Sequence, residues 1–126
     1  MVSEEFAEQV LAIALRIPPG RVMAYGDVGV AVGVEAPRAV GRVMALYGHA
    51  SPWWRVVPAS GHPPQGHARL ALPHYLEEGT PLRRVNLPKG AEPRDASISS
   101  DVDDYRIVLS AARLPYTHEV YSEVAL

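Results

Sequence analysis

Two short apolar segments separated by a glycine turn constrain the fold of this chain more than any other feature. Residues 26–32 and 36–46 each have the length and apolar content of a short helix, and Gly33 and Val34 lie between them. Pro37 suits the first turn of the second helix, where its missing N–H leaves no hydrogen bond unmade. Two short helices joined by so tight a turn have the dimensions of a helix-turn-helix. We therefore expect a mainly α fold that contains this motif.

Further elements are expected on both sides of the motif. Ser3 can cap a first helix, because its side chain can accept a hydrogen bond from a free N–H of the first turn. Pro73 must lie in the first turn of a later helix or kink it, and Gly79 ends that helix. The expected elements are a helix at 3–16, a strand-like link at 21–25, a buried segment at 56–58, a helix at 68–78, a closing strand at 81–87 and a helix at 104–114.

The second helix of the motif carries charge on one face. Arg38 and Arg42 are four residues apart and so lie on the same side of the helix. The small residues Ala39 and Gly41 flank them, and a glycine inside a helix costs about 1 kcal/mol relative to alanine. This cost indicates that something approaches the helix backbone closely at Gly41. The plainer alternative is a solvated basic face on an ordinary helix.

Charge is also unevenly distributed along the whole chain. The formal net charge is −2, but residues 16–69 hold six arginines and two acids, whereas residues 91–126 hold three arginines and seven acids. Local charge decides whether a surface binds a polyanion, although two differently solvated surfaces would have the same composition. Proline, glycine and lysine cluster near residues 88–93, which favours a boundary there. We expect a domain at residues 1–90 and an acidic C-terminal extension at residues 91–126.

No part of the sequence predicts a metal, a cofactor or a membrane span. The chain has no cysteine, which excludes disulfides, thiolate metal sites and thiol catalysis. His62, His67 and His74 lack the paired spacing of zinc motifs. No apolar run approaches the roughly 18 residues of a membrane-spanning helix. We expect a soluble, cytoplasmic protein with neither metal nor cofactor.

Five short pieces of sequence, in this order, resemble a known family. They are residues 17–22 (IPPGRV), 25–28 (YGDV), 38–41 (RAVG), 52–57 (PWWRVV) and 77–79 (EEG). Together they resemble the DNA-binding and active-site domain of the O6-alkylguanine-DNA alkyltransferases. The resemblance covers roughly residues 3–88 and implies a winged-helix-like DNA-binding domain with a short β wing, followed by a C-terminal extension.

The acceptor motif departs from the pattern of that family. The family motif is Pro-Cys-His-Arg-Val, and this chain has Trp53 in the cysteine position and Trp54 in the histidine position. Alkyl transfer needs a thiolate and a base that removes its proton. Composition therefore excludes suicidal alkyl transfer, and we expect no enzyme activity. A tryptophan in place of the cysteine is the mark of the alkyltransferase-like proteins, although their usual motif keeps the histidine.

The resemblance implies a function in DNA repair. Alkyltransferase-like proteins bind double-stranded DNA that contains O6-alkylguanine, enter the minor groove and flip the lesion into a pocket without transferring the alkyl group. They mark the lesion for nucleotide excision repair, so proteins of that pathway are the implied partners. The chain itself is expected to be a monomer.

The same resemblance implies a role for each matching residue. Arg38 would replace the flipped nucleotide in the base stack, and Tyr25 would help to rotate the nucleotide outward. The implied DNA-binding residues are Tyr25, Arg38, Ala39, Gly41 and Arg42. The implied pocket residues are Tyr25, Trp53, Val56, Val57, Ser60 and Arg69. The residues expected to be structural at the former active site are Trp54, Arg55 and Glu78.

Two other functions stay open. A winged-helix regulator of undamaged sequence would use the same helix-turn-helix, but it predicts polar side chains that contact base edges. The second helix instead offers Ala39, Gly41 and Ala45 beside its arginines, which suits close backbone contact. An enzyme that acts on the flipped base with a different nucleophile would need an activated group near Trp53, and Glu78 is the only acid that the motifs place nearby.

Overall fold

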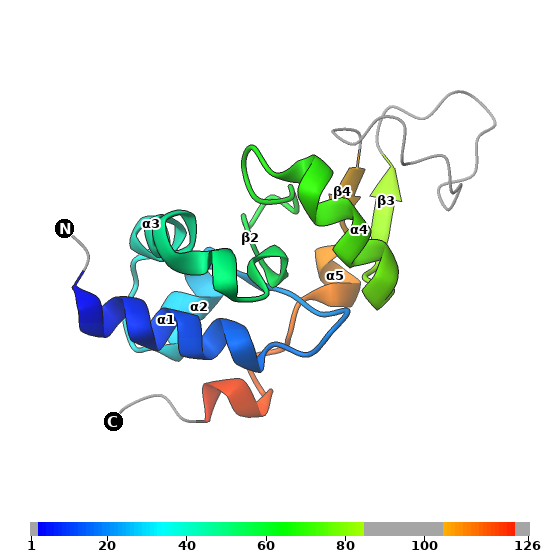
Figure 1. Ribbon diagram of the computed structural model, residues 1–126. Coiled ribbons are helices and arrows are strands. Elements are labelled where there is room, and N and C mark those ends of the chain that lie inside the picture. Colours follow the sequence, from blue (N-terminus) through cyan, green and yellow to red (C-terminus); the bar gives the residue numbers. More distant parts are fainter. Residues whose placement is uncertain (1–2, 85–104, 123–126) are drawn as a thin grey trace.

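The computed structural model describes residues 3–84 and 105–122. Figure 1 shows α1, α2 and α3 gathered at one end of the molecule and α4, β3 and β4 at the other, with β2 between them. The elements are α1 (Glu4–Arg16), β1 (Met23–Ala24), α2 (Tyr25–Ala31), α3 (Pro37–Tyr47), η1 (Gly48–Ala50), η2 (Trp53–Arg55), β2 (Val56–Val57), α4 (Ala68–Glu78), β3 (Leu82–Arg84), β4 (Tyr105–Ile107), α5 (Leu109–Ala112) and η4 (Glu119–Tyr121). The predicted mainly α fold with a helix-turn-helix is confirmed.

The helix-turn-helix is formed by α2 and α3, which pack on each other and on α1. Val40 and Val43 of α3 are fully buried against this cluster. Gly33 has a φ of 84°, which permits the tight turn after α2. Gly29 is also required, since a Cβ there would lie 2.5 Å from the carbonyl oxygen of Val34. Ser3 caps α1 as predicted by accepting a hydrogen bond of 3.1 Å from the N–H of Phe6.

A second core cluster joins α4 to the antiparallel strands β3 and β4. The rings of Tyr75 and Tyr105 meet edge to face at 6.1 Å, and both side chains are fully buried. The Tyr105 hydroxyl donates a hydrogen bond of 2.7 Å to the carbonyl of Ala68 at the start of α4. Gly79 ends α4 in the left-handed conformation, as predicted. Pro73 lies inside α4 and not in its first turn, so the first-turn placement is wrong.

Each small sheet connects distant parts of the chain. Strand β1 pairs with β2 in parallel, with Met23 opposite Val56. Strand β3 pairs with β4 in antiparallel fashion, with Leu82 opposite Ile107 and Arg84 opposite Tyr105. The first pair brings the start of the helix-turn-helix beside the tryptophan turn, and this places the candidate site.

The predicted helix over 104–114 is wrong in its first part. Tyr105–Ile107 is a strand, and only Leu109–Ala112 is helical. Tyr105 and Ile107 are buried while Arg106 between them is partly exposed, which is the alternation of a strand. Pairing with β3 supplies the backbone hydrogen bonds that favour this conformation over a helix.

The C-terminal residues 105–122 pack against the rest of the described chain. Asp27, 2% exposed, accepts hydrogen bonds from Arg113 at 2.6 and 2.8 Å and from the Tyr116 hydroxyl at 3.0 Å. The Asp27 side chain also accepts a hydrogen bond from the N–H of Ala24, which caps α2. The predicted boundary near residue 90 lies outside the described residues, so it stays a prediction. Within the described parts of the chain, no helix is long and apolar enough to span a bilayer.

Candidate functional site

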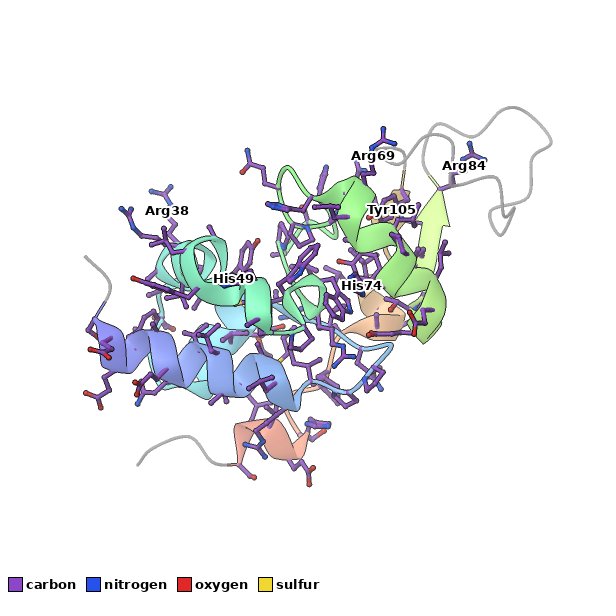
Figure 2. All side chains as sticks on the ribbon, viewed as in Figure 1. Arg38, His49, Arg69, His74, Arg84 and Tyr105 are labelled. Carbon is purple, nitrogen blue, oxygen red and sulfur yellow. The ribbon has the colours of Figure 1, made fainter. Side chains whose placement is uncertain are left out.

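A cavity of about 500 Å³ opens between α3 and the segment that leads into α4. Its volume lies within the range of small-molecule pockets. Gly41 and Ala45 of α3 contribute to its lining, as do Trp53 and His67. Figure 2 shows His49 on the α3 side and His74 on the α4 side of this region. The lining residues are Tyr25, Gly41, Met44, Ala45, His49, Trp53, Val56, Pro64, Gln65, His67 and Leu70.

Tyr25 lies at the first position of α2 and contributes its ring to the cavity wall. A Cβ on Gly41 would lie 3.7 Å from this ring, which is an ordinary van der Waals distance, so the tyrosine would tolerate an alanine there. Tyr25 therefore does not account for the glycine, and the close approach to the helix backbone at Gly41 stays a prediction. Burial raises the pKa of the Tyr25 phenol above its usual value, so the hydroxyl stays protonated at neutral pH.

Trp53 begins the short turn η2 and also lines the cavity. It packs against both core clusters and therefore lies where the two halves of the molecule meet. The ring of His67 lies 5.5 Å from the Trp53 ring, at an interplanar angle of 60°. This wall is aromatic and contains no thiol, hydroxyl or carboxylate.

Behind the tryptophan turn, Glu78 forms a network of hydrogen bonds. Its carboxylate accepts from Nε and Nη2 of Arg55 at 3.0 and 2.6 Å and from the N–H of Gly20 at 3.0 Å. Arg55 also donates to the carbonyl of Ile17 at 2.9 Å. Both charged side chains are mostly buried, at 14% and 11% exposed. Arg55 and Glu78 thus hold the backbone around the site and do not reach the cavity.

Trp54 donates the remaining hydrogen bond to this network. Its indole N–H lies 3.0 Å from Oε2 of Glu78, and its ring stacks on His74 at 3.6 Å with an interplanar angle of 7°. The hydroxyl of Tyr75 donates to the Trp54 carbonyl at 2.6 Å. An indole N–H can donate but cannot accept a proton. Trp54 therefore provides the carboxylate with a hydrogen-bond donor, but it cannot act as a general base.

The arginines predicted to contact DNA lie on exposed parts of the helices. Arg38 and Arg42 are exposed on α3, and Ala39 is partly exposed between them. Arg38 precedes Gly41 by three residues and so lies on the same face, one turn closer to the start of α3. Figure 2 shows Arg38 and Arg69 extending away from the body of the molecule.

A family model matches the sequence over residues 5–78, which is more than half of the chain. The model describes the DNA-binding domain of 6-O-methylguanine DNA methyltransferase. The chain belongs to this family. No curated protein sequence matches the chain.

Solved structures of related proteins share the fold. S. pombe Atl1 in complex with damaged DNA containing O6-carboxymethylguanine has a TM-score of 0.70 and 21% identity, covering 91% of this chain and 99% of that one. S. pombe ATL in complex with DNA has a TM-score of 0.68 and 24% identity, with the same coverage. A single-residue variant of M. tuberculosis O6-methylguanine methyltransferase has a TM-score of 0.50 and 25% identity, covering 76% of this chain and 55% of that one.

The structure brings together only some of the predicted pocket residues of this family member. Tyr25, Trp53 and Val56 line the cavity. Val57 is fully buried in the second core cluster and lines neither this cavity nor the neighbouring one described next. Ser60 lies on a neighbouring cavity of about 380 Å³, which shares Pro64 and Gln65 with the first. Arg69 is exposed on α4 and lines neither cavity.

Sequence reasoning missed several residues of the cavity. Ala45 and His49 follow Gly41, which was predicted to contact DNA but not to line the pocket, at intervals of four residues, and this helical spacing along α3 and its continuation is a signal that the sequence contains. Gln65, His67 and Leu70 come from the loop before α4 and from its first turns, where no periodicity marks them. Within residues 3–84 and 105–122, no group of three or more histidine or acidic side chains could hold a metal ion.

The carboxylates of Glu78 and Asp27 are expected to make the free energy of unfolding depend on pH. Burial alone would raise the pKa of Glu78, but hydrogen bonds from Arg55, the Gly20 N–H and Trp54 outweigh it and lower the pKa below 4.5. Burial is outweighed in the same way at Asp27, mainly by hydrogen bonds from Arg113, and its pKa falls below 3.8. Groups with a lowered folded-state pKa stabilise the fold above their unfolded-state pKa, and this contribution is lost as the pH falls through the folded-state value.

We therefore expect the free energy of unfolding to fall as the pH drops below about 4.5 and to keep falling until both carboxylates are protonated. Urea unfolding between pH 7 and pH 2 measures this dependence. Glu78→Gln removes one of the two titrating groups, so its curve should be flatter over the same range. An equally steep curve for this variant would show that Glu78 does not contribute.

Proposed function

We propose that this protein binds double-stranded DNA that contains O6-alkylguanine and accommodates the alkylated base in the cavity without transferring the alkyl group. The observation that carries the proposal is the cavity of about 500 Å³ between Tyr25 and Trp53, beside the second helix of a helix-turn-helix. Family membership supports DNA binding, and the likeness to Atl1 in complex with damaged DNA supports an alkylated base as the ligand.

The positions of the side chains are compatible with base flipping. Arg38 is exposed on α3, one turn from the cavity-lining Gly41, and its guanidinium would enter the base stack when α3 lies in the minor groove. Extrusion of a base costs a few kcal/mol, least for a poorly paired one such as O6-alkylguanine. Tyr25 would turn the nucleotide toward the cavity, and Arg42 would contact a neighbouring phosphate.

Chemistry supports a binding role without catalysis. The chain contains no cysteine, and Trp53 presents an apolar ring at the wall of the cavity. An alkyl group at O6 would pack against this ring and would meet no nucleophile. We propose that the resulting stable complex marks the lesion for nucleotide excision repair proteins, and that the protein acts as a cytoplasmic monomer.

The decisive experiment compares two duplexes that differ by one O6-methylguanine, at one fixed salt concentration. We expect tighter binding to the modified duplex, with quenching of tryptophan fluorescence. Arg38→Ala should lower the affinity ratio between the two duplexes about tenfold. The variant has no side chain to take the place of the extruded base, so less of the free energy of extrusion is recovered. Arg83→Ala removes the same charge from an exposed position on β3 and should leave the ratio unchanged.

Equal binding of the wild-type protein to both duplexes would contradict the proposal. If such binding were strong only for particular undamaged sequences, the function would instead be that of a sequence-specific regulator. Salt must be held constant, because phosphate contacts make the affinity for any duplex strongly dependent on it.

A further inference from the structure

Two aromatic rings lie behind the tryptophan wall without touching the cavity. The ring centre of Trp54 lies 5.6 Å from that of Trp53 in an edge-to-face arrangement. The ring of His74 lies 6.0 Å from Trp53, also edge to face. Trp53 lines the cavity, whereas Trp54 and His74 do not. Both rings thus pack on Trp53 from outside the cavity lining.

Trp54 is itself held on several sides. Its indole N–H donates to Glu78 at 3.0 Å, and its ring lies parallel to His74 at 3.6 Å. The guanidinium carbon of Arg55 lies 5.5 Å from the centre of the same ring. Arg55 and Glu78 are in turn joined by two hydrogen bonds. Displacement of Trp54 would break the contact with the Glu78 carboxylate and the stacking with His74 together.

We infer that the stacked pair Trp54–His74 determines which O6-alkyl groups the protein accepts, by fixing the depth of the cavity behind Trp53. This inference rests on the proposed function. A small alkyl group fits in the cavity between Trp53 and Tyr25 while Trp53 keeps its position. A bulky group requires Trp53 to move back, and the stacked pair opposes this movement. Trp54 and His74 are thus specificity-determining residues that act through Trp53.

The test compares duplexes that carry O6-methylguanine or O6-benzylguanine at the same position. Trp54→His replaces the indole by a smaller ring, and His74→Ala removes the stacking partner. Each variant should shift the affinity ratio toward the benzyl lesion by about tenfold. This is the lower end of the discrimination that one methylene group gives in an apolar pocket. Leu76→Ala changes an exposed residue of the same helix, 54% exposed, and should leave the ratio at the wild-type value.

The readout separates a specific role from general damage to the fold. A variant that only loosens the protein would weaken binding of both lesions and leave their ratio unchanged. Near-ultraviolet circular dichroism of the free protein reports the coupling of the rings, and it should change in Trp54→His and His74→Ala but not in Leu76→Ala. A shifted ratio together with this change supports the inference.

The remaining outcomes overturn it. An unchanged ratio in folded variants, while the wild-type protein still prefers modified to unmodified DNA, overturns the inference and leaves the proposed function intact. A wild-type protein that does not distinguish either lesion from guanine overturns both. If only Trp54→His fails to fold, the affinity ratio of His74→Ala tests the inference. If neither variant unfolds cooperatively, the pair maintains the fold instead of setting the depth, and the inference is wrong.

Discussion

A chain that ends at residue 90 is expected to lose cooperative folding. The C-terminal part of the described structure contributes fully or almost fully buried side chains to both core clusters. They are Tyr105, Ile107 and Ala112 in the second cluster and Leu114 and Val120 in the first. Burial of one large apolar side chain contributes about 1.5 to 3 kcal/mol, and a small domain is stable by only about 5 to 15 kcal/mol in total. The loss of four such side chains, together with Ala112, exceeds what the remaining residues can compensate.

Truncation would also remove specific polar partners. Strand β3 would lose the ladder that it shares with β4. Asp27, 2% exposed, would lose the hydrogen bonds from Arg113 and Tyr116. The N–H of Ala24 would remain its hydrogen-bond donor, but a buried carboxylate that loses its counter-charge is strongly destabilising. The loss of packing and the loss of these partners therefore act in the same direction.

Thermal unfolding monitored by circular dichroism tests this prediction. The full chain should unfold in one sharp transition, whereas residues 1–90 should show a broad one or none. A chain that ends at Ser122 keeps every described C-terminal contact and serves as the control. A sharp transition for residues 1–90 near that of the full chain would mean that residues 91–126 are an independent extension, as their charge pattern predicts.

Replacement of Glu78 by alanine is expected to lower the free energy of unfolding by about 3 to 5 kcal/mol, the range found when one partner of a buried ion pair is removed. The carboxylate is 11% exposed and is the acceptor for donors from three residues. Without it, the mostly buried guanidinium of Arg55 loses its counter-charge, and the N–H groups of Gly20 and Trp54 lose their acceptor. Urea unfolding at pH 7 measures the loss.

Glu77 provides a matched control at the preceding position. It is exposed, so Glu77→Ala should change the free energy of unfolding by less than about 0.5 kcal/mol. Tryptophan fluorescence should also differ between the two variants, because the Trp54 indole donates its hydrogen bond to Glu78. A loss below about 1 kcal/mol for Glu78→Ala would show that water replaces the carboxylate at little cost.

Much of the fold was predictable because its signals are local. The cap at Ser3 and the stop at Gly79 each depend on backbone conformation within a few residues. The two helices of the motif are similarly marked by short apolar segments and a glycine turn. Strand β4 was missed because three residues are too short to show a period of two, and its conformation depends on pairing with β3.

The candidate site was predictable only in outline. Tyr25, Trp53 and Val56 line one cavity, as the resemblance implies, but Ser60 lies on the neighbouring one. The path of the loop before α4 decides this difference, and no sequence pattern specifies that path. His67 reaches the cavity for the same reason.

The sequence by itself determined the chemistry that this protein lacks and the family to which it is similar. Without a cysteine, no residue can act as a thiolate acceptor, whatever the fold. Only the tertiary structure decided how Trp54 is used, since its hydrogen bond to Glu78 and its stacking on His74 join residues 24 and 20 positions apart. Such contacts depend on how α4 packs behind the tryptophan turn. Composition and local periodicity carry no information about that packing.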